Sequence, residues 1–434
     1  MKKLTRLMAL LLAVLMLSAV FVGCHKKDEI AFKIGDFEYT SAMYSCSLYF
    51  AATSARNDIY TFVEESGGDT KKEINYNSYK FDAEGKVSKT GTISYEKYVR
   101  DEAVNQLKKF AALDAAFKNG NLKLDDDQIT TAEYNATSYW NYGCDYNTYV
   151  QYATSNQLDS LAYSYMPYYY LLEKNGVSFD TYKKYYTYDT MYGYYFEHLY
   201  GEKGEKAIAK DDITKYLSEN YTVANTISFS KTGSDGKTLS EEKLKELKAI
   251  ADGYAERLNN GEDFETIYKE ENKRLEDEQK AANTSSISTS SNASDTSSAA
   301  SNVTSSEASS TASSTSSATT SSESDEYKPA AYVGIFGNEG TAYEHKLFKD
   351  ILSQDLGKAV VLEDTENSMY LLVSRFDILE EEYWYTNLRT TISYALKQEE
   401  FDKSLDTAGA AMKFTEDTYA TKPFKVKKIK FDVE

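Results

Sequence analysis

The chain has little cysteine, proline or histidine, and each shortage limits what it can be. The three histidines are scattered and no Cys/His cluster has metal-ligand spacing, so we expect no metal site and no cofactor. Beyond Cys24 only Cys46 and Cys144 remain, and they could pair in an oxidising compartment or stay as separate buried thiols. Three prolines in 434 residues are typical of long uninterrupted helices. The formal net charge of −19 makes nucleic acid an unsuitable partner.

The N-terminus predicts export and a lipid anchor. Three basic residues among the first six precede a charge-free apolar run over 7–22, which is too short and wrongly flanked for a membrane span. We therefore expect a signal peptide over 1–23. The run ends in FVGC, which resembles the bacterial lipobox and implies lipidation of Cys24; ordinary cleavage with Cys24 as a bystander is the alternative. A lipid on Cys24 would hold the protein at the extracytoplasmic face of the cell membrane through a tether over 24–29, without a membrane-spanning segment.

Hydrophobic spacing in the first half predicts a hairpin followed by helices. IAFKIGDFEYT, residues 30–40, alternates and turns at Gly35-Asp36, which indicates a β-hairpin. Residues 65–92 are polar and contain glycine, so a loop or irregular hairpin is expected there. The periodicity predicts helices over 41–54, 94–118, from about 125, 145–173 and 179–202.

The second half predicts an α+β segment interrupted by a low-complexity tract. Residues 283–325 are almost all Ser, Thr, Ala and Asn, and such a tract has too little apolar surface to offset its ordering entropy, so a disordered surface insert is expected. Before the insert we expect a helix capped by Asp211, a strand at 221–230, a helix with capping-box spacing at Thr238 and Glu241, and a short helix capped by Asp263. After it we expect a strand from Tyr332, a helix at 343–353, and strands at 359–363 and 368–375. The chain then continues with an expected helix at 380–406 and a strand at 424–432.

Several segments in order resemble the SurA/PrsA class of extracytoplasmic foldases. AFKIGDFEYTSAMY, VRDEAVNQLKKFAALDAAFKNGNLKLDDDQIT and GVSFDTYKKYYTYDTMYGYYFEHLY are similar to its helical chaperone domain; TVANTISF, RLNNGEDFETI, YVGIFGNEG and LSQDLGKAVVLEDTENSMYLLVSRFD are similar to its parvulin-type peptidyl-prolyl isomerase domain. The resemblance implies an α+β fold. It assigns a chaperone domain to 30–210, a parvulin-like domain to 211–282 and 326–378, and a helix and strand that return to the chaperone domain to 379–434.

The catalytic positions depart from the parvulin pattern. That family carries a histidine on the first strand and another on the last, which fall here on Thr226 and Tyr370. Its proline-pocket positions fall near Tyr343, Leu347 and Leu352, and its catalytic loop falls in the serine-rich insert. The resemblance therefore implies a degenerate isomerase site.

Tyrosine is the residue in excess, with 39 copies. Tyrosine offers a large contact area, a polar tip and little rotamer entropy to lose, which suits adaptable recognition, although tyrosines at helical spacing also fill cores. The candidate surface for unfolded polypeptide is drawn from the run over 163–200 and comprises Tyr168, Tyr169, Tyr170, Tyr192 and Tyr195.

Three functions remain open from the sequence. The first is a lipid-anchored chaperone that binds unfolded or newly secreted polypeptide. The second is a working prolyl isomerase with an unorthodox site. The third is a surface interaction lipoprotein that reuses the scaffold.

Overall fold

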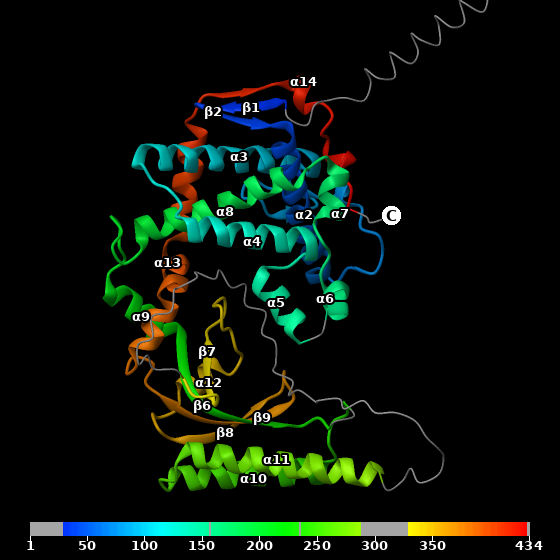
Figure 1. Ribbon diagram of the computed structural model, residues 1–434. Helices are drawn as coiled ribbons and strands as arrows, with labels where there is room; N and C mark the ends of the chain where they lie inside the picture. The colour runs from blue at the N-terminus through cyan, green and yellow to red at the C-terminus, as the bar shows by residue number, and fades with distance from the viewer. Residues whose placement is uncertain (1–28, 156–157, 234–235, 288–328, 432–434) are drawn as a thin grey trace, which may run out of the picture. The chain divides into compact units, whose positions relative to one another are not determined.

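The computed structural model describes residues 29–155, 158–233, 236–287 and 329–431 and shows a mixed α+β protein with small antiparallel sheets. The predicted signal peptide and Cys24 lie outside these residues, as does most of the predicted insert. The described chain forms two compact units, the first from residues up to 206 and from 397 onward, the second from 207–396. The long helix α13, Glu382–Ala410, begins in the second unit and ends in the first (Figure 1).

The first unit is mainly helical, with two small sheets. Its strands are β1 Ile30–Ile34, β2 Phe37–Thr40, β3 Lys80–Phe81, β4 Val87–Ser88, β5 Ile93–Ser94 and β10 Phe414–Glu416. Its helices are α2 Ser41–Glu65, α3 Tyr95–Gly120, α4 Asp126–Tyr142, α5 Tyr146–Thr154, α6 Leu158–Ser164, α7 Tyr169–Leu172, α8 Phe179–Tyr200 and α14 Thr418–Thr421, with short 3-10 helices η1 Tyr76–Ser78, η2 Glu173–Asn175 and η3 Val426–Lys428.

One of these sheets joins the two ends of the described chain, in the order β10-β1-β2. β1 and β2 form the expected hairpin, which Gly35 turns with a φ of +60°, a conformation that favours glycine. β10 pairs with the other edge of β1 and places Glu416 opposite Phe32. Arg100 of α3 donates to both carboxylate oxygens of Glu416 at 2.9 and 2.8 Å. The C-terminal segment thus returns to the first strand, but through 414–416.

The strand predicted over 424–432 is wrong. The chain forms the 3-10 helix η3 there, with Val426 buried and Ile429 packed against the aromatic core. These two apolar residues are three apart, which is the period of one 3-10 turn and not the alternation of a strand. β1 is already paired on both edges, with β10 and β2, so a strand at 424–432 could not pair with it.

The first unit's helices pack around aromatic side chains. α2 lies against α3 and α8, and α4 against α8. Phe110 and Tyr188 stack with ring centroids 3.9 Å apart. The helix starts follow local capping, because Thr40, Ser94 and Asp125 each accept a backbone N–H of the first turn.

Two predicted helices have different bounds. α2 continues to Glu65 instead of ending at 54. The expected single helix over 145–173 is three, α5, α6 and α7. The break between α6 and α7 falls at 165–168, because the residue before Pro167 is disfavoured in helical conformation.

The second unit is a four-stranded antiparallel sheet with helices. Its strand order is β7-β6-β9-β8. The elements are α9 Lys210–Asn220, β6 Tyr221–Ser230, α10 Glu241–Asn259, α11 Phe264–Ile287, β7 Val333–Gly337, α12 Phe348–Leu352, β8 Ala359–Asp364, β9 Met369–Phe376 and the start of α13.

Successive residues of the central strands point to opposite faces of this sheet. Ile227 and Phe229 pack under α10 and α11, whereas Ala224 packs on the face covered by α12. Figure 1 shows α10 and α11 together along one face, with α12 on the other side of β6. Both faces are therefore filled by helices.

Three local predictions in the second unit need correction. α9 begins at Lys210 without a side-chain cap, so Asp211 lies inside its first turn. α10 is capped by Ser240, whose hydroxyl accepts the Lys243 N–H, and not by Thr238. Asp263 caps α11 as expected, but that helix continues to Ile287 and is not short.

Candidate functional site

Four tyrosines of α4 and α5 form a connected series of ring contacts on the first unit. The ring centroids of Tyr134 and Tyr146 are 5.1 Å apart. Those of Tyr146 and Tyr149 are 6.4 Å apart, and those of Tyr149 and Tyr142 are 4.0 Å apart. The side chains of Tyr134, Tyr142 and Tyr146 are 54%, 37% and 40% exposed. We call these four residues the tyrosine ladder.

The two ladder residues of α4 are exposed because the opposite side of that helix faces the core. Ala132, Ala136 and Trp140 follow one another at intervals of four and are buried. Tyr134 and Tyr142 lie on other faces of the helix, since each residue advances by about 100° along a helix with 3.6 residues per turn. The sequence of α4 thus presents two aromatic rings to the surface.

α5 is a helix with no buried residue. Its N-terminus is capped by Asp145, which accepts the backbone N–H and the hydroxyl of Thr148 at 3.0 and 2.7 Å. A nine-residue helix is marginal in water by itself, and here it is stabilised by its cap, by ring contacts with α4 and by the contact of Tyr152 with Tyr165. Its tyrosines are therefore presented to solvent on a helix whose stability depends on those same rings.

Gly143 positions α5 beside α4 and the segment before α7. It ends α4 with a φ of +78°, and its N–H donates to the Tyr139 carbonyl at 2.9 Å. A Cβ here would lie 2.3 Å from the carbonyl oxygen of Met166, so only glycine allows that close approach. The Tyr168 N–H also donates to the Tyr139 carbonyl, at 3.2 Å.

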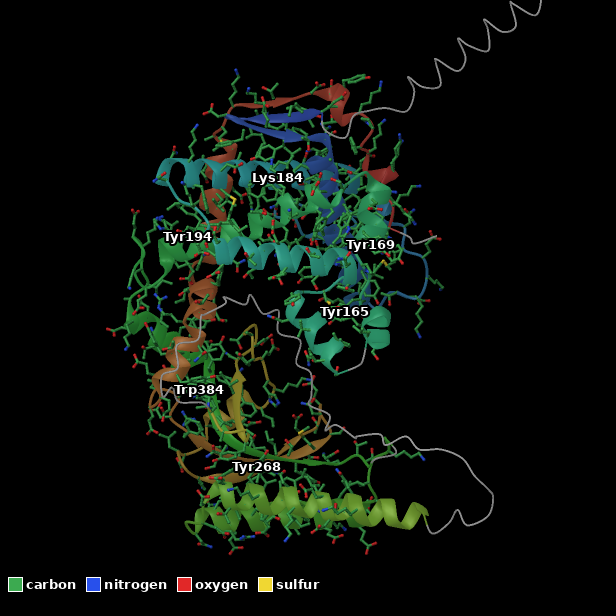
Figure 2. All side chains as sticks on the ribbon, in the orientation of Figure 1. Tyr165, Tyr169, Lys184, Tyr194, Tyr268 and Trp384 are labelled. Atoms are coloured by element: carbon green, nitrogen blue, oxygen red, sulfur yellow. The ribbon has the colours of Figure 1, made fainter. Side chains whose placement is uncertain are left out.

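Two of the five predicted tyrosines are accessible on α7. Tyr169 is half-buried and Tyr170 is 42% exposed, and their rings stack with centroids 4.1 Å apart. Tyr168 instead lies in the core against Phe50 and Tyr182, and burial raises its pKa to about 12. Figure 2 labels Tyr165 and Tyr169 on this part of the unit.

The other two predicted tyrosines pack against α13. The ring centroids of Tyr192 and Tyr195 lie 4.8 and 5.7 Å from that of Phe401. The Tyr192 hydroxyl donates to Asp402 at 3.3 Å. These residues attach α8 to α13 and do not join the ladder, so the five predicted residues do not form one surface.

Sequence reasoning missed the whole ladder, because it followed the density of tyrosine over 163–200. Dense aromatic runs at helical spacing fill a core, as Tyr182 and Tyr188 do. The sequence pattern that could have indicated the exposed tyrosines of α4 and α5 was weaker. Tyr146 and Tyr149 are three apart in a short segment that offers no aliphatic stripe to bury, after a helix with regularly spaced alanines.

The ladder presents neutral groups. A hydrogen bond with the Tyr149 side chain, together with partial burial, raises the pKa of Tyr142, so its hydroxyl stays protonated at neutral pH. The nearest charged residue on α4 is Glu133, beside Tyr134, whose carboxylate pairs with Lys183 at 3.2 Å, and Asp145 caps α5 next to Tyr146. The surface suits apolar and hydrogen-bonding ligands that carry no large negative charge.

The second unit does not bring the two predicted catalytic positions together. Thr226 pairs with Val373 across β6 and β9, and both residues belong to the face that α12 covers. Tyr370 pairs with Phe229 and lies on the opposite face, against the cluster under α10 and α11. The Thr226 hydroxyl is already used, because it donates to the Tyr332 carbonyl at 3.1 Å.

The predicted proline-pocket positions are divided as well. Leu347 and Leu352 belong to the packed cluster beside β6 and β9. Phe348 and Ile351 of the same cluster are 3% and 0% exposed, so this face is filled by side chains. Tyr343 stands apart, 41% exposed, with its ring near Tyr221.

His345 lies before α12, and not on a helix as its sequence position indicated. Its Nδ1 accepts the Leu347 N–H at 3.2 Å, and its Nε2 lies 3.4 Å from Asp364 Oδ2. Although burial opposes ionisation, hydrogen bonds from Asn367 hold the pKa of Asp364 below its usual range. Both polar atoms of the imidazole are thus engaged in the local structure.

Two further searches cover the described residues only. No described helix is long and apolar enough to cross a membrane. No group of three or more His, Cys, Asp and Glu side chains in the described ranges could hold a metal ion. Comparison of the chain with family models, with curated proteins and with solved structures finds no match.

Proposed function

We propose that this protein binds unfolded polypeptide, and that the tyrosine ladder is a principal contact surface. The observation that carries the proposal is the ladder itself: four connected rings, two on α4 and two on α5, a helix with no buried residue. Exposed aromatic side chains that gather on one surface are typical of interaction sites. The accessible pair Tyr169 and Tyr170 extends the aromatic surface of the same unit.

The chemistry of the ladder fits a ligand without a fixed sequence. Tyrosine rings offer a broad apolar area at a low cost in side-chain entropy, and their hydroxyls accept or donate to any exposed peptide group. Newly exported chains expose apolar side chains and unpaired backbone groups together. The ladder can contact both, and a neutral surface would bind them with little dependence on salt.

The N-terminal sequence pattern supports a cellular location that suits this function. A signal peptide over 1–23 and a lipid on Cys24 would hold the protein at the outer face of the cell membrane, where exported chains emerge unfolded. Cys24→Ala should then release the protein from the membrane fraction after signal cleavage. Retention of the variant in that fraction would contradict the lipid anchor.

The packing of the second unit supports a structural role in this function rather than isomerase activity. The face of its sheet that holds Thr226 is packed with Leu347, Phe348 and Ile351, so it offers no slot for a proline ring. Tyr370 lies on the other face. We therefore propose no catalytic activity for it.

The test is suppression of aggregation of a chemically unfolded model client, measured by light scattering. The variant changes Tyr134, Tyr142 and Tyr146 to Ser, and we expect it to lose most of the suppression. The matched control changes three exposed tyrosines elsewhere, Tyr60, Tyr343 and Tyr419, to Ser and should retain it.

Far-UV circular dichroism and thermal melting establish that both variants are folded. Equal suppression by the two triple variants would refute the ladder as the binding surface. No suppression by the unmodified protein with any client would favour the third function, a surface interaction lipoprotein.

A further inference from the structure

A polar pocket lies in the first unit, away from α4 and α5. It has a volume of about 490 Å³, is open to solvent, and is lined by α2, the η1 loop, the start of α3 and the C-terminal tail. Its principal lining residues are Arg56, Asn75, Tyr76, Asn77, Lys427 and Phe431. We infer that this cavity binds a carboxylate at the C-terminus of a polypeptide, with Arg56 as the receptor.

Arg56 is held between two aromatic rings. Its Cζ lies 4.2 Å from the ring centroid of Tyr76 and 3.9 Å from that of Phe431. Both faces of the planar guanidinium are therefore covered. Its N–H donors lie in the plane between the rings, which fixes the direction from which an acceptor can approach.

Those donors have no anionic partner in the described part of the chain. Arg56 contacts rings on both faces, and no ion pair or hydrogen bond of its guanidinium occurs among the described residues. Other arginines of this protein are paired, as Arg100 is with Glu416 and Arg257 with Glu262. An arginine whose orientation is fixed and whose donors are unused is suited to bidentate binding of a carboxylate.

The remaining walls match the end of a peptide. Lys427 adds a second positive charge and Glu73 one negative charge, so the lining is net positive in a chain with a net charge of −19. Asn75 and Asn77 bring amide groups that can pair with a peptide bond. Apolar surface from Ile429 and its neighbours can receive the last side chain.

The ligand class rests on the proposed function, because a protein that binds unfolded chains meets free C-termini. The residues are different from the ladder, so each site can fail alone.

The probe is a fluorescein-labelled pentapeptide, Ala-Ala-Ala-Ala-Phe, with a free C-terminal carboxylate, compared with its C-terminal amide by fluorescence anisotropy. We expect the amide to bind about tenfold more weakly or worse, because a charge-assisted bidentate contact is lost. Arg56→Gln should lower the affinity for the carboxylate form by a similar factor and leave the amide unchanged. Arg56→Lys keeps the positive charge but lacks the paired N–H donors of the guanidinium. Its affinity for the carboxylate peptide should therefore lie between those of the unmodified protein and Arg56→Gln.

Lys123→Gln is the matched control, since it makes the same charge change at an exposed site outside the cavity, and it should bind as the unmodified protein does. The ladder variant with Tyr134, Tyr142 and Tyr146 changed to Ser should also bind the pentapeptide normally. Carboxylate binding that survives in the ladder variant, whether or not that variant still suppresses aggregation, separates this site from the ladder.

Equal binding of the carboxylate and amide peptides, an Arg56→Gln variant that binds normally, or no binding of either peptide would overturn the Arg56 site.

Discussion

The side-chain amide of Asn175 pairs with the backbone of Lys430 as a neighbouring strand would. Asn175 Nδ2 donates to the Lys430 carbonyl and Asn175 Oδ1 accepts the Lys430 N–H, both at 2.9 Å. Nδ2 also donates to the Leu171 carbonyl at 2.8 Å. The Asn175 side chain thus supplies hydrogen-bond partners to the backbone of the C-terminal tail, where no strand is present. It also fixes the position of the segment that carries Phe431 into the Arg56 cavity.

Asn175→Ala should release this tail. The loss of three hydrogen bonds should lower the free energy of unfolding of the first unit by about 3 kcal/mol, because each net bond contributes roughly 1 kcal/mol. Limited trypsin digestion followed by mass spectrometry should show faster cleavage after Lys428 and Lys430. The exposed Asn119→Ala on α3 is the control and should digest normally. A tail that stays protected in Asn175→Ala would contradict this account.

A buried carboxylate should make the first unit less stable as pH rises. Tyr39 and Tyr188 both donate to Asp114 Oδ2 at 2.8 Å. Burial raises the pKa of Asp114 above its usual range, although these hydrogen bonds oppose the shift. Because the folded state favours the protonated form, the stabilisation is complete below the pKa of an unfolded aspartate and is lost as pH rises through the raised value.

Asp114→Asn should remove this pH dependence, since the amide oxygen still accepts from both hydroxyls without becoming charged. Urea unfolding between about pH 4 and pH 7 should show the variant gaining stability relative to the unmodified protein as pH rises. Asp355→Asn, at an exposed position, should show no such trend. A gain that appears only as pH falls would have the wrong sign for a raised pKa.

The two described cysteines should be unreactive thiols. Cys46 and Cys144 are free and buried, so the possible disulfide between them does not form. Burial raises the pKa of Cys46 well above its ordinary value and that of Cys144 to about 11, so little thiolate is available at neutral pH. In a Cys24→Ala background, a thiol-specific chromogenic reagent should label no cysteine in the native protein and two after unfolding in guanidinium. Rapid labelling of the native protein would disprove this.

Local rules predicted much of the fold. The alternation over 30–40 gave the hairpin, and helical spacing gave the starts of α3, α4 and α8, where the structure shows Ser and Asp caps. The tail was mispredicted because its stability comes from Asn175, which lies 255 residues away. The order of strands and the docking of α5 beside α4 likewise depend on contacts that no local pattern contains.

The candidate site was less predictable for the same reason. Whether a tyrosine fills a core or faces solvent is decided by what packs on its helix. Tyr168 and Tyr170 are two apart, yet the first lies in the core and the second is exposed. In the second unit a single residue of strand register decides the face, and Tyr370 is on the other side from Thr226.

That register makes a definite prediction for isomerase activity. Xaa-Pro bonds isomerise over tens of seconds or longer unless one site grips the proline and polarises the amide from the same side. Restoring histidine at both inferred positions, Thr226→His with Tyr370→His, should leave isomerisation of a short Xaa-Pro peptide at its uncatalysed rate. The imidazoles would lie on opposite faces of the β6–β9 pair, and the Thr226 face is filled by Leu347 and its neighbours.

The informative comparison places both imidazoles on one face. Val373 lies directly opposite Thr226, so Thr226→His with Val373→His juxtaposes them. Val373 is fully buried, and histidine there should destabilise the second unit without creating a proline slot. A protease-coupled peptide assay and thermal melting on both double variants separate these effects. Acceleration by the Thr226/Tyr370 variant would mean that the two strands are offset by one residue from the register described here, because only such a shift would bring both side chains to one site.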